Sequence, residues 1–352
     1  MIKYYTRPCN FYYGSQSKKL IKKKKSLPLA GNNLISFDNV EIFKKKKKKI
    51  TSKTIKIKDI RFLKKKEKIK VLEDIKKITK KRVFLKNKNH FIMGIINMTP
   101  DSFSDGGKFN SMNKAIQKIK QMRRAGAVII DIGGESTRPG SKIISQKHEL
   151  QRVKKIIEKF KKKFPKTLLS VDTRKSQVMN FSIKNNVDII NDVSCFKFDQ
   201  KSFNVINNKN LWKIIHHMQG TPQTMQINPS YQNVLLDIYD FFENQIKKFK
   251  SDKFGKKIIL DPGIGFGKNL KHNLMILHKI SIFHSLGFPI LIGTSRKRFI
   301  SQISGYYDTK ERIGGTLSSI LFSFSQGIKI FRVHNVEEVK QGLLVFEALM
   351  KK

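Results

Sequence analysis

Short apolar runs recur along the chain from residue 91 onward, and each ends in polar residues. The runs are rich in Ile, Val and Leu and are six or seven residues long, which is typical of strands buried on both faces. They cover residues 91–97, 128–134, 168–173, 188–194, 212–218, 257–263, 290–295 and 328–334.

The segments between these runs carry apolar residues three and four positions apart, which predicts amphipathic helices. The predicted helices cover residues 111–127, 148–164, 176–186, 199–210 (a shorter one), 234–250, 271–287, 311–327 and 336–352. Eight strands that alternate with eight helices over about 260 residues favour an α/β fold of the (β/α)₈ TIM barrel type. An open doubly wound sheet is the alternative.

The first 90 residues have a different character. Lysine runs at residues 22–25 and 44–49 flank an alternating segment, residues 32–43, that predicts a strand or hairpin. Residues 1–37 contain no acid, as in transit peptides, but lysine stands where such peptides use arginine. We therefore divide the chain into a lysine-rich N-terminal extension of unknown role, residues 1–90, and a barrel, residues 91–352. Removing the extension should leave turnover within a few-fold unless it folds onto the barrel.

The formal net charge of +47 admits two interpretations. Residues 1–90 supply +24 of it, from 27 Lys, 3 Arg and 6 acids, and a basic segment of this kind can bind nucleic acid. However, 61 Lys stand against 12 Arg in a chain rich in Asn, Ile and Phe, which indicates compositional drift toward A/T-rich codons. Aromatic residues are not interleaved with the lysines as single-strand binders require. We expect no nucleic-acid partner, and the arginines that persist become informative: Arg138, Arg174, Arg296, Arg298, Arg312 and Arg332.

The cysteines and the hydropathy limit the compartment. Cys9 and Cys195 form neither a disulfide framework nor a metal-ligand pattern. No run approaches the ~18 apolar residues of a membrane span, and no apolar stretch of signal-peptide length follows the N-terminus. We expect a cytoplasmic protein without a membrane partner.

Polar residues stand at the end of nearly every predicted strand. In chain order these are Asn97, Asp172, Asn191, His216, Asp261, Ser295 (with Lys297 two residues on), Arg332 and His334. A barrel brings the carboxyl ends of its strands to one rim, where catalytic residues gather. The sequence therefore predicts one active site at this rim.

The chemistry of these residues falls into two sets. Asp172, Asn191 and Asp261 offer acceptors that suit a flat heterocycle with adjacent N–H donors. Lys297 could cover a ring carbonyl or nitrogen from the other side. Arg332 and His334 lie two apart on a strand and point the same way, so with the amide of Asn97 they predict an anion site.

Two loops of the predicted rim are rich in glycine, hydroxyls and charge. They are TPDSFSDGGKF, residues 99–109, and GESTRPG, residues 134–140. This composition is typical of loops that close over a substrate and exclude water. In addition, Ser295 and Arg296 are predicted to open a helix whose free N–H groups could hold a carboxylate.

The stretch DPGIGFGK, residues 261–268, is glycine-rich but is not the dinucleotide pattern G-x-G-x-x-G. A nucleotide-binding fold is therefore disfavoured. The glycines are better explained if they let the backbone and Phe266 approach a ligand ring closely.

With these residues in place, residues 91–352 resemble the dihydropteroate synthase family. The resemblance lies in eight ordered motifs: MGIINMTPDSFSDGG, DIGGESTRPG, SVDTRK, IINDVS, HHMQGTPQTMQ, LDPGIGFGKN, GTSRKRFI and RVHNV. It implies a pterin-binding barrel that joins 6-hydroxymethyl-7,8-dihydropterin pyrophosphate to 4-aminobenzoate. The products are 7,8-dihydropteroate, a folate precursor, and pyrophosphate, by an S_N1-like alkyl transfer.

The resemblance also implies residue roles, Mg²⁺ as cofactor and a homodimer formed through the last helices. Asp172, Asn191, Asp261 and Lys297 would hold the pterin, in a pocket lined by Phe266 and Gly293. The pyrophosphate would meet Asn97, Arg332 and His334, with Asn97 also on Mg²⁺, and the aminobenzoate side would comprise Phe103, Thr137, Arg138, Pro139 and Ser295. The chain departs from the pattern at His216, which stands where an apolar residue, often Met, usually lines the pterin pocket.

Two alternatives remain at this stage. A pterin-binding methyltransferase on the same barrel would share the pterin acids but has no use for the anion groups or the two loops. A basic nucleic-acid-binding protein would instead use the lysine runs.

Overall fold

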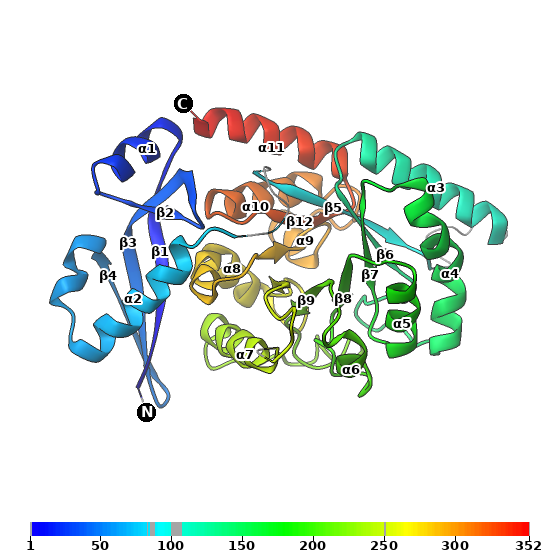
Figure 1. Ribbon diagram of the computed structural model, residues 1–352, viewed down its shortest axis with the longest axis horizontal. Coiled ribbons are helices and arrows are strands. Elements are labelled where there is room, and N and C mark those ends of the chain that lie inside the picture. The colour runs from blue at the N-terminus through cyan, green and yellow to red at the C-terminus, as the bar shows by residue number, and fades with distance from the viewer. Residues whose placement is uncertain (1, 83, 85–88, 100–107, 250, 352) are drawn as a thin grey trace.

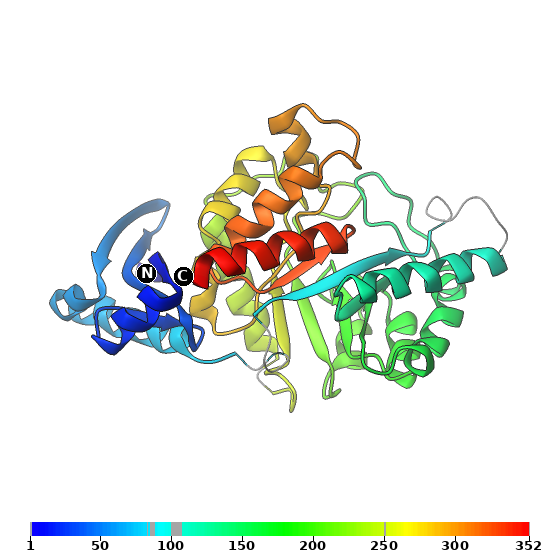
Figure 2. The ribbon, with the colours of Figure 1, turned by 90° about the horizontal axis from the view of Figure 1, so that it is seen from above.

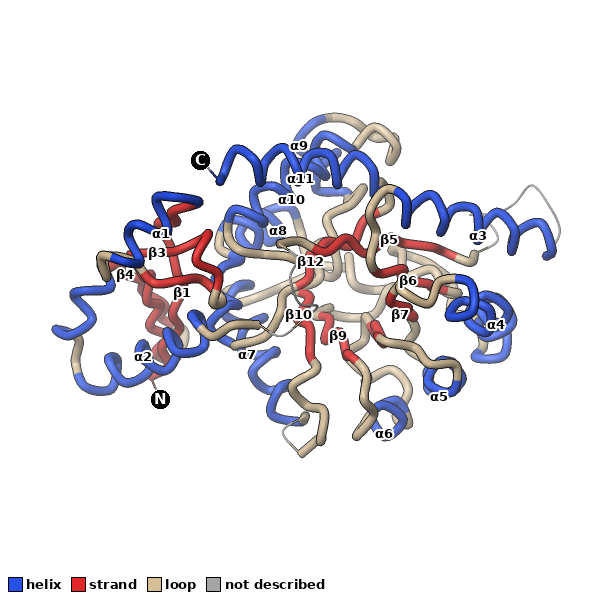
Figure 3. Tube along the Cα trace, turned by 45° about the horizontal axis from the view of Figure 1, so that its top comes forward, coloured by secondary structure: helices blue, strands red, loops and turns tan. Residues whose placement is uncertain are grey.

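The computed structural model describes residues 2–82, 84, 89–99, 108–249 and 251–351, and its main body is a parallel barrel (Figures 1 and 3). In this part of the chain eight strands pair in the order β10-β9-β8-β7-β6-β5-β12-β11. The ring is closed by a parallel bridge between Leu260 and Ile290, with a 2.9 Å hydrogen bond from the Leu260 N–H to the Pro289 carbonyl. The predicted barrel is confirmed. Its strands are β5 (Phe91–Asn97), β6 (Ile129–Gly133), β7 (Leu168–Asp172), β8 (Ile189–Asp192), β9 (Trp212–His216), β10 (Ile258–Asp261), β11 (Leu291–Ile292) and β12 (Ile330–Val333).

Helices surround this ring and bury their apolar faces against it (Figure 3). They are α3 (Lys108–Arg124), α4 (Gln146–Lys163), α5 (Ser176–Lys184), α6 (Ser202–Ile206), α7 (Val234–Lys248), α8 (Leu270–His278), α9 (Arg298–Ser304), α10 (Ile313–Ser325) and α11 (Val336–Lys351). The prediction of one helix over 271–287 is wrong: α8 ends at His278 and a 3₁₀ helix, η3 (Ile280–Leu286), follows. Every residue of η3 is buried, so this segment has no solvent-facing side.

The lower interior of the barrel is filled by apolar residues from the first positions of the strands. Phe91, Met93, Ile129 and Ile259 are among them, and each is at most 3% exposed. Phe84, from the segment before β5, packs edge-on against Phe91 and Trp212 with ring centroids 5.4 and 4.7 Å away. The amino-terminal end of the barrel is thereby covered by apolar side chains.

Residues 2–79 form an additional unit, which we call the N-terminal module. It contains β1 (Ile2–Tyr13), α1 (Gly14–Lys22), β2 (Leu27–Leu29), β3 (Asn32–Lys46), β4 (Lys49–Lys56), η1 (Ile57–Phe62) and α2 (Lys65–Thr79). The long β3 pairs antiparallel with β1, β2 and β4. The alternating segment 32–43 is thus a strand, as its pattern predicts.

The module lies against the side of the barrel, and the arrow of β5 points away from it (Figures 1 and 2). Side chains alternate along a strand, so one face of its sheet carries Tyr5 and Phe43, paired across β1 and β3. Both belong to the main core cluster together with barrel residues, and the Tyr5 ring meets Tyr239 of α7 edge-on at 5.1 Å. The other face of the sheet packs on α2 through Val40 and Ile42.

Ion pairs border this apolar contact. Lys3 lies 2.6 Å from Asp240 and 2.7 Å from Glu243, and Lys45 lies 3.1 Å from Asp237, all three acids being on α7. Some of the module's lysines therefore neutralise an acidic stretch of the barrel.

A second ion-pair cluster joins the module to the start of η3. Glu41 of β3 accepts from Arg7 at 2.7 Å and from Lys279, the residue before η3, at 2.6 Å. The condition on the deletion prediction is therefore met, because the extension folds onto the barrel.

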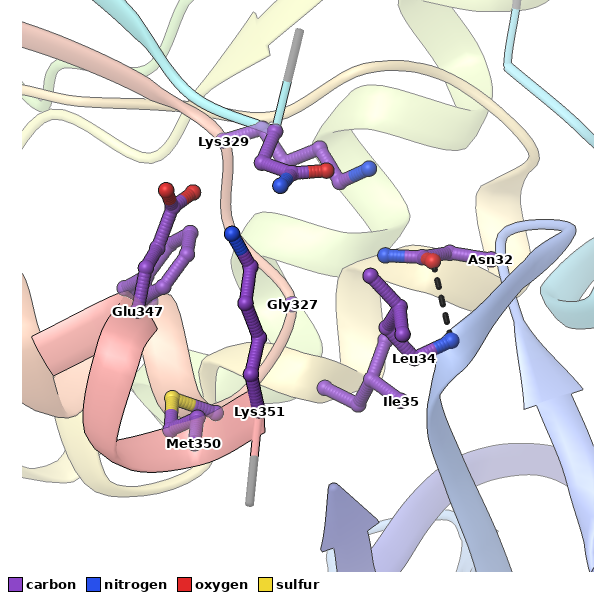
Figure 4. Close-up of a pocket in the computed structure, with 10 residues that line it drawn as sticks. Asn32, Leu34, Ile35, Gly327, Lys329, Glu347, Met350 and Lys351 are labelled. Carbon is purple, nitrogen blue, oxygen red and sulfur yellow. Dashed lines mark hydrogen bonds between the residues drawn. The ribbon is translucent and has the colours of Figure 1, made fainter. Parts of the chain in front are cut away.

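The junction also forms a small open pocket of about 50 Å³ (Figure 4). Leu34 and Ile35 of β3 line it from the module, and Glu347 and Met350 of α11 from the barrel. The carboxylate of Glu347 is held by Nδ1 of His90 at 2.9 Å. The amino-terminal and carboxyl-terminal segments of the chain thus meet in one packed region.

None of the described helices has the length and apolarity needed to cross a bilayer.

Candidate active site

The carboxyl ends of the strands place the predicted residues at one end of the barrel. Asn97 ends β5, Asp172 ends β7 and Asp261 ends β10, while Asn191 lies in β8. A Cβ atom at Gly133, which ends β6, would lie 3.5 Å from Cβ of Asp172 and 3.9 Å from Oδ1 of Asn97. The glycine therefore leaves the space between an amide and a carboxylate open.

Arg332 of β12 reaches across the mouth to two acids. Its Nε donates to Asp131 at 2.6 Å and an Nη donates to Asp172 at 2.7 Å. These carboxylates raise the pKa of the guanidinium further above its usual range despite burial. The arginine predicted for the anion site thus also orients a carboxylate predicted for the pterin.

Asp131 was missed by the sequence analysis. It is fully buried in β6, and besides Arg332 it accepts from Ser170 at 2.6 Å and from the amide of Asn191 at 3.2 Å. One acid therefore fixes side chains from three other strands. The available signal was an acid within the otherwise apolar run 128–134, which no core packing explains.

The acids of the mouth are buried, and burial raises their pKa values. The pKa of Asp172 rises to about 7, with the Arg332 charge opposing this, and the pKa of Asp261 rises to about 6. Oδ1 of Asp261 accepts from the Gly263 N–H at 2.8 Å. Oδ1 of Asn191 is buried without a hydrogen-bond partner among the described residues. The nearest basic nitrogen to Oδ2 of Asp261 in this part of the chain is Nε2 of His216, at 3.9 Å. Two acceptors thus stand ready for N–H donors of a ligand.

Lys297 and His216 both contact the ring of Phe266. Nζ of Lys297 lies 4.0 Å from the centroid of the Phe266 ring, and the His216 ring meets that ring edge-on at 4.5 Å. Nε2 of His216 lies 3.9 Å from Oδ2 of Asp261. Burial lowers the pKa of His216 well below its usual value and that of Lys297 to about 8. The pocket wall at His216 is consequently polar but uncharged at neutral pH.

The neighbouring Lys268 was also missed. It is 2% exposed, and its Nζ lies 3.0 Å from Nδ1 of His217 and 2.8 Å from the carbonyl of Phe266. Burial lowers the pKa of Lys268 to about 7. This lysine fixes the glycine-rich turn after β10, where Gly263 and Gly265 adopt positive φ angles of 67° and 80°.

His334, predicted for the anion site, and Ser295, predicted for the aminobenzoate side, are linked to each other. Nδ1 of His334 lies 3.0 Å from Oγ of Ser295, and the His334 N–H donates to the same oxygen at 3.2 Å. Burial and the nearby Arg296 lower the pKa of His334 to about 3, so the imidazole is neutral. Gly293 was predicted to line the pterin pocket. A Cβ atom at this position would lie 3.9 Å from Cβ of Arg332.

The prediction that a helix begins at Ser295 and Arg296 is wrong. Helix α9 begins only at Arg298, after Lys297, and has seven residues. The Arg296 N–H is already bonded to Oγ1 of Thr316 at 3.1 Å. This N–H is therefore engaged within the protein and is not free to hold a carboxylate.

The loop GESTRPG has a rigid base and an exposed tip. Glu135 is buried and accepts from Arg174 at 2.8 Å and from Lys175 at 2.8 Å, which explains the acid in the motif. Thr137 is half-buried, while Arg138 and Pro139 are exposed. The charge of Arg138 is among those that lower the pKa of His334, so the loop tip lies on the anion side of the mouth.

Phe103 and most of the loop 99–109 lie outside the described residues. Among the described residues no group of three or more His, Cys, Asp or Glu could hold a metal ion. The oxygen of Asn97 is a hard ligand that suits Mg²⁺, and this ion usually takes its remaining ligands from substrate phosphates and water. The residues present therefore fit a metal that is carried largely by a diphosphate.

The sequence and the fold both have close counterparts. The profile of the family described as "Pterin binding enzyme" matches residues 93–334. Dihydropteroate synthase from Escherichia coli is 41% identical over 260 residues, which are 74% of this chain and 91% of the relative. The chain belongs to the dihydropteroate synthases, a family of pterin-binding enzymes.

Solved structures of this family agree. A dihydropteroate synthase from Clostridium difficile, determined in the presence of pteroic acid, has a TM-score of 0.70 at 37% identity and covers 77% of this chain and all of its own. The enzyme from Xanthomonas albilineans with 4-aminobenzoic acid has a TM-score of 0.69 at 31% identity, over 76% of this chain and 96% of its own. The family match begins at Met93, so the N-terminal module lies outside it.

Proposed function

We propose that this protein condenses 6-hydroxymethyl-7,8-dihydropterin pyrophosphate with 4-aminobenzoate, giving 7,8-dihydropteroate and pyrophosphate in folate biosynthesis. The family relationship supports this reaction, and the names of relatives at about 40% identity state the same activity. The observation that carries the proposal is Oδ1 of Asn191, which is buried without a hydrogen-bond partner among the described residues, together with the buried carboxylate of Asp261 at the same barrel mouth. A pterin edge with adjacent N–H donors satisfies both.

In the proposed mechanism the C–O bond between the methylene carbon and the pyrophosphate breaks first, and its electron pair leaves with the pyrophosphate. The positive charge that remains on the methylene is delocalised into the dihydropterin ring. Asp172 and Asp261 face this ring and stabilise its positive charge in the transition state, which raises turnover more than tight substrate binding does. Lys297 holds the ring carbonyl from the side of Phe266.

The leaving group is held on the other side of the mouth. Asn97, Arg332 and the neutral His334 donate hydrogen bonds to the pyrophosphate, and Mg²⁺ bound there would supply further neutralisation of its charge. The amine of 4-aminobenzoate then attacks the methylene carbon to form the new C–N bond, and its extra proton passes to an oxygen of the released pyrophosphate. A weakly basic aniline requires no strong general base beforehand, and His216 contributes a wall to the pterin pocket.

The aminobenzoate side is formed by Thr137, Arg138, Pro139 and Ser295, with Phe103 as a further proposed member. Closure of the loop 134–140 over the substrates would keep water from the cation. The buried pairs of Glu135 keep the loop base fixed, so that motion is confined to its exposed tip.

Replacing Arg138 with alanine should raise KM for 4-aminobenzoate about tenfold or more, because a charge-assisted contact of about 1.5–3 kcal/mol is lost. Affinity for the pterin pyrophosphate should change less than about threefold. Steady-state kinetics with each substrate varied in turn gives both values, and Arg124→Ala, which removes an exposed arginine at the end of α3, is the control for removing a charge. An equal loss of both affinities would contradict the assignment of the loop.

The activity itself is tested with the purified full-length chain, the two substrates and a defined concentration of Mg²⁺. Release of pyrophosphate together with formation of dihydropteroate, followed by chromatography, is the expected result. Methyl transfer from methyltetrahydrofolate to a corrinoid without pyrophosphate release would favour the methyltransferase. Salt-dependent retention on DNA without either reaction would favour the nucleic-acid binder.

We also propose that the protein is a homodimer joined through the helices α8 to α11. These adjacent helices carry exposed apolar side chains, namely Leu274, Met275, Ile303, Phe322, Leu344, Val345 and Leu349. A groove of about 450 Å³ runs between α8, α9 and α10. A contiguous apolar face of this kind marks an interface, and a two-fold axis lets the same face serve both copies.

Replacing Phe322, which is 47% exposed on α10, with glutamate should shift the protein from dimer to monomer in sedimentation velocity. Phe62, which is 73% exposed on the module, is the matched control, and Phe62→Glu should leave the dimer intact. Dimerisation that survives Phe322→Glu would place the interface elsewhere. The cytoplasm is the compartment we propose, since Cys9 and Cys195 are both unpaired.

A further inference from the structure

A single turn after β11 presents Ser295 and Lys297 to the mouth, and the residue between them is in an unusual conformation. Arg296 has a φ angle of +61°, in the left-handed region that favours glycine. A side chain at this φ is strained, so the turn persists only if its surroundings hold it. The turn therefore requires a restraint that glycine would not need.

Helix α10 provides the first restraint. Oγ1 of Thr316, which is 1% exposed, accepts from the Arg296 N–H at 3.1 Å. Thr316 lies in the first turn of α10, far from the pterin acceptors of β8 and β10 along the chain. A side chain outside the proposed substrate contacts thus fixes the backbone of the turn from behind.

Arg312, the residue before α10, provides the second restraint. One Nη of Arg312 donates to the carbonyl of Arg296 at 3.0 Å, and its Nε donates to the carbonyl of Tyr306 at 3.2 Å. The other Nη donates to the carbonyl of Tyr307. The planar guanidinium offers several fixed donors, so it can join three carbonyls where a lysine ammonium, a compact charge, cannot reproduce that geometry.

The side chain of Arg296 forms the third restraint. Its Nε and one Nη donate to Oδ1 of Asn335 at 3.1 and 2.7 Å, and the Asn335 amide in turn donates to Glu338 at 2.7 Å. Asn335 follows His334, the residue that bonds Ser295. The turn after β11 is thereby coupled to the segment after β12.

We propose that Arg312 and Thr316 are positioning residues that hold the strained turn at Arg296, and through it place Ser295 and Lys297 for the reaction. This inference rests on the proposed function and adds two residues to it. It also gives a role to Arg312, an arginine that persists in a lysine-rich chain. Neither residue needs to touch a substrate, because both act on the backbone at Arg296.

The decisive experiment uses glycine to remove the strain. In Arg312→Ala, kcat should fall about ten- to a hundredfold, since small displacements of positioned groups are costly. Pterin affinity by calorimetry should change by less than about fivefold, because three of the four proposed pterin-holding residues, Asp172, Asn191 and Asp261, lie on other strands and only Lys297 is displaced. In the double variant Arg296→Gly/Arg312→Ala, kcat should recover at least about threefold, because glycine adopts the positive φ without the clamp.

Matched variants separate positioning from folding. Arg298→Ala removes an exposed arginine in the same segment and should leave kcat within about twofold of wild type. Thr316→Val should lower kcat and Thr316→Ser, which keeps the hydroxyl acceptor, should restore it. If Arg312→Lys retains full kcat, or if glycine at position 296 gives no recovery in the Arg312→Ala background, the positioning role is overturned. The wild-type assay tests the reaction itself, so a failure there is distinct from a failure of these variants.

Discussion

Replacing Asp261 with alanine is expected to weaken pterin binding by about 3–6 kcal/mol, which is two to four powers of ten in affinity. The basis is the loss of two hydrogen bonds to a buried carboxylate, at about 1.5–3 kcal/mol each. The carboxylate is 5% exposed, and the Gly263 N–H that it accepts would also be left without its partner. Isothermal calorimetry with 6-hydroxymethyl-7,8-dihydropterin pyrophosphate measures the effect.

Asp261→Asn is the matched control, since asparagine keeps the shape and can still accept from Gly263. It should lose less affinity than the alanine variant but remain well below wild type, because the charge is gone. Thermal denaturation must show that both variants are folded. Unchanged pterin affinity in a folded Asp261→Ala protein would remove this residue from the pterin site.

The same carboxylate gives a pH dependence. Burial raises the pKa of Asp261 to about 6, with Arg332, Lys297 and Lys268 as the cations that oppose this rise. Below that pH the carboxyl is protonated and can no longer accept two N–H donors, so pterin affinity should fall as pH drops from 7 to 5. Asp172, whose pKa is raised to about 7, should add to the loss. In Asp261→Asn the part of this fall in pterin affinity that is due to protonation of residue 261 should disappear.

Replacing Tyr5 with alanine is expected to destabilise the whole protein by about 3–5 kcal/mol, the range for deleting a large buried aromatic ring. Tyr5 is fully buried between the module and α7, stacks edge-on with Tyr239 and donates to Asp240 at 2.9 Å. Urea denaturation followed by circular dichroism gives the free energy of unfolding. A single transition at lower urea is expected, because the module and the barrel share one core.

Two variants sharpen this prediction. Tyr5→Phe keeps the ring and loses only the hydroxyl, so it should cost about 0.5–1.5 kcal/mol. Tyr12→Ala, on the same strand but bonded through Asp38 within the module, should cost less than Tyr5→Ala. Loss of the whole module should leave η3 uncovered and the barrel prone to aggregation. A soluble and fully active protein lacking residues 2–82 would show that the shared core is dispensable.

Much of the barrel could be predicted because its strands are buried on both faces. Ile, Val and Leu then form continuous runs, and the predicted strands agree with the observed ones to within a few residues at each end. The site residues at the strand ends could be predicted equally well, since a parallel barrel brings every carboxyl end to one rim. The role of Asp131 could not be predicted, because this residue lies in mid-strand and its partners come from other strands of the barrel.

Other features depend on contacts that sequence periodicity does not contain. Residues 271–287 have helical spacing throughout, yet β1 and α2 of the module pack on residues 280–286 and the chain takes a 3₁₀ path there. The turn at Arg296 is helped by Thr316 and Arg312, twenty and sixteen residues further on. Local preference is overridden in both places by partners distant in the chain.

The contact of the module with α7 has a consequence for biosynthesis. Lys3 and its partner Asp240 are separated by 237 positions, so the ribosome finishes the module long before its docking surface exists. At roughly 5–20 residues per second, about 10–50 s pass during which Tyr5 and Phe43 face solvent on a nascent chain. The lysines that border these rings then repel other nascent copies, and the module can dock only after α7 has been synthesised.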